Sequence, residues 1–305
     1  MKYENFSLKM SDGNSNVIHM WTPELEPEFV VVLSHGMAEH ALRYEELASF
    51  ICENSGAIVI EDHRGHGKTA ELNKMNLGVI GNISYKRCAE DIHEEIVFAK
   101  NKFPGSKIIL IGHSFGSFLA QYNIENYGKE IDKAILLGTA GPRPLTIAAA
   151  KVFGFIVSAF TGRSNNSSLL NSITFGANNA RIKNPKTDSD WISSDAVSVD
   201  IYKMDKMCGF VCSSGFMLNL YRLLGNIHKK RNMKKIPKEL PVKVMAGTDD
   251  PVGLYGKSVS NLAAIYCKNG IRDLSLKLYS GARHELLSDK CRYDVINEII
   301  SFCKK

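Results

Sequence analysis

Short apolar runs alternate with longer helical repeats along most of this chain. Seven runs bounded by turn residues predict strands, at residues 16–21, 29–34, 57–61, 107–112, 134–137, 242–246 and 274–278. Apolar positions at helical spacing predict helices at 43–54, 84–102, 115–127, 257–268 and 292–303. We expect Asp289 to cap the last of these helices. Strands alternating with helices are typical of an α/β fold with a mostly parallel central sheet flanked by helices.

The alternation stops between residues 142 and 232. This stretch carries an apolar helical segment at 145–160, a polar loop at 162–168 and a second helical region at 210–227. We expect a helical cap, inserted at 142–232 over the carboxyl edge of a sheet formed by residues 1–141 and 233–305. The apolar segment is interrupted by Lys151 and is shorter than the roughly 18 to 20 apolar residues of a membrane span, so we predict no transmembrane segment.

The composition is that of a globular protein with a substantial core. Of 305 residues, 44% are hydrophobic and 23% are charged, and the net charge is only +6. Because basic and acidic residues are interspersed, we do not expect nucleic-acid binding. The one local excess of basic residues predicts a solvated helix end or loop, with transient contact to an anionic lipid surface as the alternative; its members are Lys229, Lys230, Arg231, Lys234 and Lys235.

The cysteine pattern predicts reduced thiols and a cytoplasmic location. Seven cysteines are scattered along the chain, with no C-x-x-C pair and no spacing typical of a disulfide framework. Residues 1–12 also lack the apolar segment of a secretory signal.

Candidate chemistry begins at Gly112-His113-Ser114-Phe115-Gly116, which joins a predicted strand to a predicted helix. A turn sharp enough to present a serine hydroxyl crowds the strand against the helix, so its flanking positions favour residues without a Cβ. Gly112 and Gly116 meet this need, with His113 as a supporting residue. The motif predicts Ser114 as an activated nucleophile; the alternative is a glycine-rich turn with an inert serine.

A serine nucleophile needs a base and an acid, which in this architecture follow it in the order acid, then histidine. Only His284 lies after the serine in a loop that follows a predicted strand. The loop after strand 242–246 offers two candidate acids, Asp249 and Asp250, and only one of them can point at the imidazole. Pro251 biases Asp250 toward an extended backbone, which suits a side chain turned inward.

The developing oxyanion of acyl transfer needs hydrogen-bond donors. The backbone N–H of Phe115, directly after the nucleophile, is one candidate. The N–H of Met37, in the loop after strand 29–34, is the other, and Gly36 lets that backbone approach closely. We expect no metal and no cofactor, because the histidines show no metal-ligand spacing; they are His35, His40, His63, His66 and His113.

Five motifs together resemble the monoacylglycerol lipase and lysophospholipase-like branch of the α/β hydrolases, over nearly the whole chain. They are His35-Gly36-Met37-Ala38-Glu39-His40 with Arg43-Tyr44, Asp62-His63-Arg64-Gly65-His66-Gly67, Gly112-His113-Ser114-Phe115-Gly116, Gly247-Thr248-Asp249-Asp250-Pro251-Val252-Gly253 and Gly281-Ala282-Arg283-His284-Glu285. The resemblance implies an α/β-hydrolase fold with Ser114 as nucleophile, His284 as base and Asp250 as acid. It also implies an oxyanion hole formed by the amides of Met37 and Phe115.

The expected activity is hydrolysis of carboxylic esters through an acyl-enzyme, on a small lipid-like substrate such as a monoacylglycerol or a lysophospholipid. The alternatives on the same site are a short-chain or aryl esterase, a thioesterase and an acyltransferase. A hydrolase-like protein that binds a small molecule without turnover is a further alternative.

Overall fold

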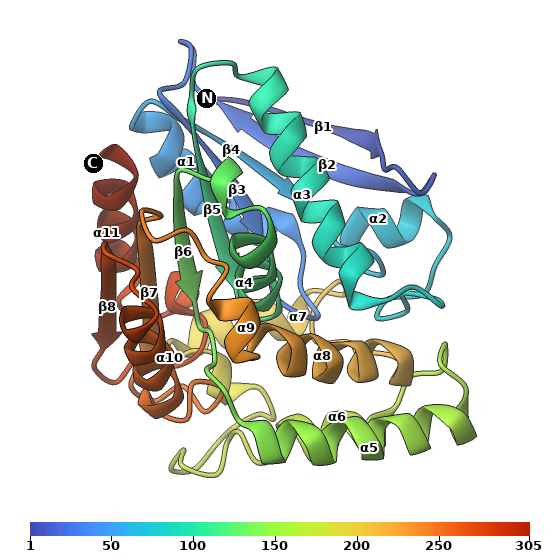
Figure 1. The fold of residues 1–305 in the computed structure, drawn as a ribbon. Helices are drawn as coiled ribbons and strands as arrows, with labels where there is room; N and C mark the ends of the chain where they lie inside the picture. Colours follow the sequence, from blue (N-terminus) through green and yellow to red (C-terminus); the bar gives the residue numbers. More distant parts are fainter.

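The computed structural model describes residues 1–305 and contains a single eight-stranded sheet (Figure 1). Its strands run in the order β1-β2-β4-β3-β5-β6-β7-β8, and all pairs beyond β4 are parallel, whereas β2 is antiparallel to both β1 and β4. The strands are β1 (Lys2–Lys9), β2 (Ser15–Thr22), β3 (Phe29–Ser34), β4 (Gly56–Glu61), β5 (Lys107–His113), β6 (Lys133–Leu137), β7 (Val242–Gly247) and β8 (Leu274–Tyr279). The seven predicted strands are therefore confirmed, and β1 was not predicted.

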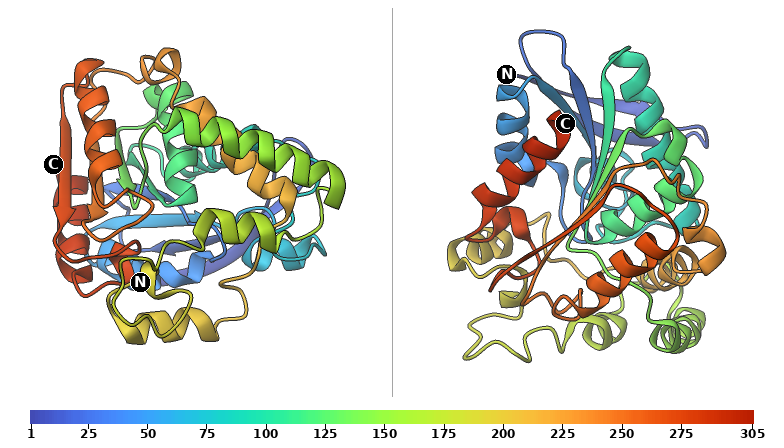
Figure 2. Two further views of the ribbon diagram at one scale, coloured as in Figure 1. Left: turned by 90° about the horizontal axis from the view of Figure 1, so that it is seen from below. Right: turned by 60° about the vertical axis from the view of Figure 1, so that its left-hand side comes forward.

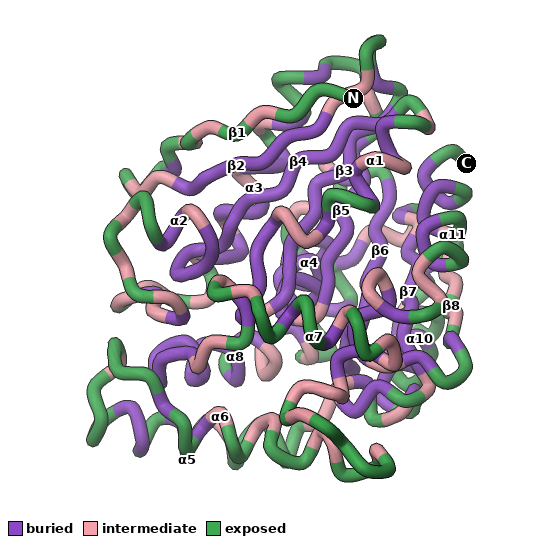
Figure 3. The backbone as a smooth tube through the Cα atoms, turned by 180° about the vertical axis from the view of Figure 1, so that it is seen from behind, coloured by how far each residue is buried: buried purple, intermediate pink, exposed green.

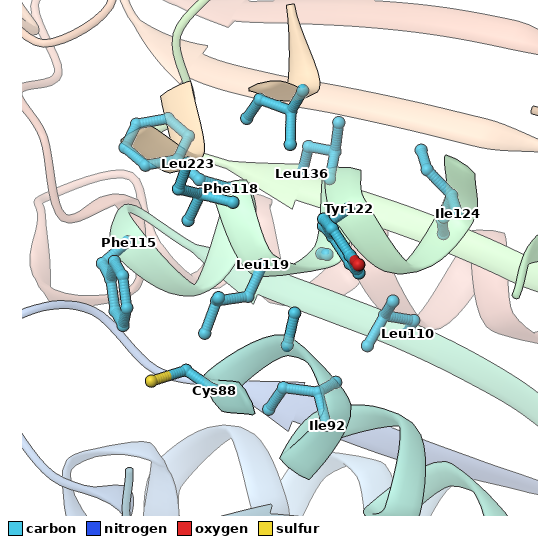
Figure 4. Close-up of a cluster of buried hydrophobic side chains, with 14 of the residues drawn as sticks. Cys88, Ile92, Leu110, Phe115, Phe118, Leu119, Tyr122, Ile124, Leu136 and Leu223 are labelled. Atoms are coloured by element: carbon cyan, nitrogen blue, oxygen red, sulfur yellow. The ribbon is translucent and has the colours of Figure 1, made fainter. Parts of the chain in front are cut away.

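Helices cover both faces of the sheet, as predicted. Helices α1 (Glu45–Glu53) and α11 (Arg292–Lys304) cover one face, and α3 (Tyr85–Lys102), α4 (Phe115–Asn126) and α10 (Lys257–Lys268) cover the other. Strand β5 shows why the core has two layers, because Ile109 and Ile111 pack toward α1 and α11 while Ile108 and Leu110 pack toward α3 and α4. Figure 4 shows the second layer, in which Leu110 lies between side chains of α3 and α4.

The start of α1 and the cap of α11 differ from the prediction. A short 3₁₀ turn, Ala41–Tyr44, precedes α1 in place of the expected helical start at residue 43. The expected cap of α11 by Asp289 is wrong, since the residue before that helix is Cys291. The Asp289 carboxylate is buried and instead accepts hydrogen bonds from the amides of Ser194 and Arg283.

The segment between β6 and β7 is helical and lies at the carboxyl ends of the parallel strands (Figure 1). The two expected helical regions are present as α5 (Pro144–Thr161) and α8 (Ser214–Ile227), which lie side by side in Figures 1 and 2. Several short helices were not predicted: α2 (Gly67–Leu72), α6 (Ser168–Phe175), α7 (Ala196–Met204), α9 (Lys230–Met233) and the 3₁₀ turns Gly128–Glu130, Asp190–Ile192 and Leu286–Ser288. We refer to residues 142–232 as the cap.

Helix α5 is longer than the apolar helical segment expected at 145–160. It extends over 18 residues with a mean hydropathy of 1.6, so by length and composition it could cross a membrane. Only Gly154, Val157 and Ser158 are buried, on the side that faces α8. Much of the remaining surface of α5 is apolar and exposed (Figure 3).

Candidate active site

Ser114 lies on a strained turn between β5 and α4. Its backbone has φ 51° and ψ −117°, a conformation rare for a residue with a side chain, and its N–H donates to the Leu137 carbonyl at 3.0 Å. A Cβ on Gly112 would lie 2.5 Å from the Gly116 carbonyl oxygen, and one on Gly116 would overlap the Ser34 carbonyl. The two glycines thus allow α4 to start directly against the neighbouring strands.

The structure brings His284 and Asp250 to this serine. The Ser114 Oγ lies 2.8 Å from His284 Nε2, and His284 Nδ1 lies 3.1 Å from Asp250 Oδ1. Asp250 is fully buried and its Oδ1 also accepts the Val252 N–H at 2.8 Å, whereas Asp249 is exposed. Burial alone would lower the pKa of His284, but the charge of Asp250 and its hydrogen bond outweigh burial and raise this pKa above its ordinary value.

The two candidate oxyanion donors lie at the same place. Met37 and Phe115 both line the cavity into which Ser114 opens. The N–H of Gly36 donates to Glu39 Oε1 at 2.5 Å, and a Cβ on Gly36 would collide with that carboxylate. Glycine at this position therefore lets a buried carboxylate hold the loop that carries Met37.

A buried ion-pair network joins three loops of the site. The Glu39 carboxylate accepts hydrogen bonds from the Tyr44 hydroxyl at 2.9 Å and from Arg43 at 2.5 Å, and His113 Nδ1 lies 3.0 Å from it. Arg43 also binds both carboxylate oxygens of Glu285, the neighbour of His284. Burial alone would raise the pKa of Glu39, but Arg43 and His113 hold this pKa well below its ordinary value. His113 thus lies in this network, beside the loop of Glu39.

The turn at residues 62–67 is held by hydrogen bonds, and its histidines contact other residues of the protein. The Asp62 carboxylate accepts the N–H groups of Ala41 at 2.8 Å and Lys68 at 2.7 Å. The rings of His35 and His63 lie in tilted contact with centroids 4.0 Å apart, although the two residues come from different strand-end loops. His40, Asp205 and Cys208 hold ligand-type atoms within 4.8 Å of one another, and His40 Nε2 pairs with Asp205 Oδ2 at 2.8 Å.

Two adjoining cavities lie at the site, and the smaller of them contains Ser114. One, of about 300 Å³, is lined by Ser114 and His284 and, from the cap, by Trp191, Tyr202 and Gly209. The larger, of about 540 Å³, lies between the cap and the core, and 12 of its 19 lining residues are hydrophobic. Four residues line both cavities: Phe118, Phe175, Leu220 and Val252. The cap residues at the site carry no sequence motif and were not predicted.

The sheet, the serine turn and the inserted helices define an α/β hydrolase. A family model described as serine aminopeptidase, S33, matches residues 25–291, and the chain belongs to this family. It is 26% identical over 294 residues to a monoacylglycerol lipase of Mycolicibacterium smegmatis, covering 94% of this chain and 91% of the relative. It is 25% identical over 278 residues to the human monoglyceride lipase, covering 90% and 82% of the two chains.

Among solved structures, the chain is similar to a highly thermostable carboxyl esterase from Bacillus coagulans in complex with glycerol. The TM-score is 0.92 at 28% identity, with 100% of this chain and 98% of the esterase covered. The resemblance drawn from the five motifs and the predicted fold are therefore confirmed. The protein is a carboxylic-ester hydrolase.

Proposed function

We propose that this enzyme hydrolyses monoacylglycerol- or lysophospholipid-like esters through Ser114, His284 and Asp250. Ser114 Oγ attacks the ester carbonyl while His284 Nε2 accepts its proton, and Asp250 stabilises the resulting imidazolium. His284 then donates the proton to the departing alcohol, leaving an acyl-serine. Water, deprotonated by His284, attacks the acyl group, and the carboxylic acid leaves as Ser114 regains its proton. The amides of Met37 and Phe115 bind the oxyanion of both tetrahedral intermediates.

One observation carries the reaction type: the chain of contacts from Ser114 Oγ through the His284 imidazole to the buried Asp250, at 2.8 and 3.1 Å. A serine hydroxyl becomes a nucleophile when a base lies within hydrogen-bond reach and an acid orients that base. The strained backbone of Ser114 supports the same role, since such strain is typical of a nucleophile elbow.

The substrate class is supported by the shape and lining of the two cavities. The cavity at Ser114 offers polar groups near the reacting atoms, and the adjoining 540 Å³ cavity offers an apolar wall for an acyl chain. Relatives named monoacylglycerol lipase and monoglyceride lipase support a lipid ester as well. We place the acyl chain in the larger cavity and the leaving alcohol in the smaller one.

A lipid surface is the proposed source of the substrate. Helix α5 exposes large apolar side chains, and the basic residues 229–235 follow α8 directly. Gly225 of α8 packs against Ile147 and Lys151 of α5, so the end of α8, which the basic cluster follows, lies close to the first turns of α5. An apolar helix beside a basic cluster favours transient contact with anionic lipid. The seven unpaired cysteines support a reducing compartment such as the cytoplasm.

The test is a series of nitrophenyl and glycerol esters with acyl chains of two to eighteen carbons, with Ser114→Ala as the control. A maximum at long chains that disappears in Ser114→Ala is the expected result. A maximum at short or aromatic acyl groups would instead assign an esterase, and transfer to an added alcohol or thiol in preference to water would assign an acyltransferase. Failure of Ser114 to react with a fluorophosphonate would leave only a binding role.

A further inference from the structure

Ala38, directly after Met37, is the strained residue of the loop that carries the proposed oxyanion donor. It is buried and holds a left-handed backbone with φ 56°. An alanine keeps this conformation only where its surroundings hold it in place. On one side, the Ala38 N–H donates to Nε2 of the buried His66 at 3.1 Å. On the other side, the Ala38 carbonyl is held by the cap.

The cap contacts come from one short stretch, residues 202–209. The Ala38 carbonyl accepts the N–H of Gly209 at 2.9 Å and the hydroxyl of Tyr202 at 3.1 Å. Two residues farther along the loop, His40 pairs with Asp205 of the same cap stretch at 2.8 Å. The loop that carries Met37 is thus attached to the cap at two successive points.

We propose that Tyr202 is a positioning residue for the oxyanion hole, assisted by Asp205. Its hydroxyl holds the Ala38 carbonyl, and this contact keeps the preceding Met37 N–H directed at the position where the oxyanion forms. The proposal rests on the function proposed above, in which the Met37 amide is an oxyanion donor. The oxyanion hole is then complete only while residues 202–209 are docked on the loop. Position of the cap and stabilisation of the transition state are therefore coupled.

The hydroxyl of Tyr202 can be removed without disturbing the contacts of its ring. The guanidinium of Arg43 lies 4.9 Å from the ring centroid, and the ring belongs to a small buried cluster with Val199 and Cys208. Removing only the hydroxyl leaves these contacts in place. The Ala38 carbonyl also keeps the Gly209 N–H as a donor, so no buried carbonyl is left unpaired. Tyr202→Phe therefore tests the hydrogen bond without removing the packing.

For Tyr202→Phe we expect kcat on a soluble short-chain ester to fall on the order of 10- to 100-fold, with KM changed by less than about threefold, because oxyanion stabilisation acts in the transition state. Affinity for an alkylboronic acid, which forms a tetrahedral adduct with the serine, should fall in parallel with kcat/KM. The end point of fluorophosphonate titration, which counts reactive serines, should equal that of the wild type. An equal end point would show that activity falls because the oxyanion donor is misaligned and not because less enzyme is folded. Asp205→Asn should give the same pattern with a smaller decrease.

Tyr127→Phe is the matched control, since the Tyr127 hydroxyl donates to Glu90 between α3 and α4. It should leave kcat and boronate affinity unchanged. Unchanged kcat and boronate affinity in Tyr202→Phe would overturn the proposal, and so would a rise in KM alone, which would indicate a contact with substrate. Full ester hydrolysis by Ser114→Ala would overturn the proposed function itself. An inactive Ser114→Ala beside a wild-type-like Tyr202→Phe would overturn only the positioning role.

Discussion

The two neighbouring aspartates in the loop after β7 differ in burial and in the residues that their side chains contact. Asp250 is fully buried and contacts His284 Nδ1, whereas Asp249 is exposed and lies beside Thr248. If Asp250 orients the imidazole, Asp250→Asn should lower kcat on the order of 10⁴-fold, because the amide favours the wrong tautomer of the histidine. Ser114→Ala should lower kcat on the order of 10⁶-fold. Both are measured as kcat on one soluble nitrophenyl ester.

Asp249→Asn is the matched control for this prediction. It makes the same chemical change one residue away, at a side chain open to solvent, and kcat should stay within about twofold of the wild type. Equal losses at positions 249 and 250 would contradict the assignment of the acid.

The raised pKa of His284 sets the expected pH dependence. The imidazole must be neutral to accept the serine proton, so activity is lost as the pH falls through the pKa of the folded enzyme. Because Asp250 raises that pKa above the ordinary value of 6.5, the acidic limb of kcat/KM should have its midpoint above pH 6.5. In Asp250→Asn the limb of the residual activity should move to lower pH. A limb unmoved by this substitution would show that another group titrates.

Ser114 and His284 could be predicted because each lies next to a feature that can be recognised in the sequence. Ser114 lies between two glycines at a strand end, and His284 follows the last strand. The choice between Asp249 and Asp250 needed the family resemblance, since adjacent residues share one local signal. Tyr202 and Trp191 could not be predicted, because they reach the site through packing of the cap and no local pattern marks that approach.

At the level of elements, prediction succeeded where burial is strong and failed where it is weak. The parallel strands are apolar on both faces and stand out as continuous runs. Strand β1 lies at the sheet edge and alternates between exposed and half-buried residues, with Phe6 and Leu8 as its inward apolar side chains. Helices α6 and α7 have few buried positions, so their sequences show little repetition of apolar residues at helical spacing.

The exposed face of α5 predicts binding to lipid vesicles. Phe155 is 59% exposed and Phe160 is 88% exposed, although full burial of a phenylalanine side chain is worth about 1.5 to 3 kcal/mol. Replacing both by serine should therefore weaken binding to anionic vesicles by at least about tenfold, because each 1.4 kcal/mol changes a binding constant tenfold. Co-sedimentation with phosphatidylcholine–phosphatidylglycerol vesicles measures this change. Activity on a soluble short-chain ester should stay at the wild-type level.

Leu25→Ser provides the control for the α5 substitutions. Leu25 is 83% exposed and lies in the loop that leads into the amino end of β3, whereas the cap lies at the carboxyl ends of the parallel strands. Its replacement should not alter vesicle binding. Equal vesicle binding by the wild type and the α5 double variant would contradict a role for this helix at a lipid surface.

In the whole molecule, hydrogen bonds join the cap to the loops of the candidate site. Trp191 and Ile192 of the cap accept the N–H groups of His284 and Glu285 through their carbonyls, and residues 202–209 hold the loop of Met37. The same cap forms one wall of the apolar cavity, whose other wall comes from the core. The cap therefore contacts both the proposed catalytic loops and the proposed acyl chain. Substitutions in the cavity wall should change chain-length preference without changing the chemical step.

Ala150 of α5 is suited to test this separation, because it is half-buried and lines the 540 Å³ cavity. Ala150→Trp should shorten the space for an acyl chain while leaving Ser114 and its partners untouched. Each methylene excluded from the cavity forfeits about 0.8 kcal/mol, so losing two should lower kcat/KM for a sixteen-carbon ester roughly 15-fold relative to a four-carbon ester. Ala148→Trp, on the exposed side of the same helix, should leave the chain-length profile unchanged. A parallel loss at every chain length would place the acyl chain outside this cavity.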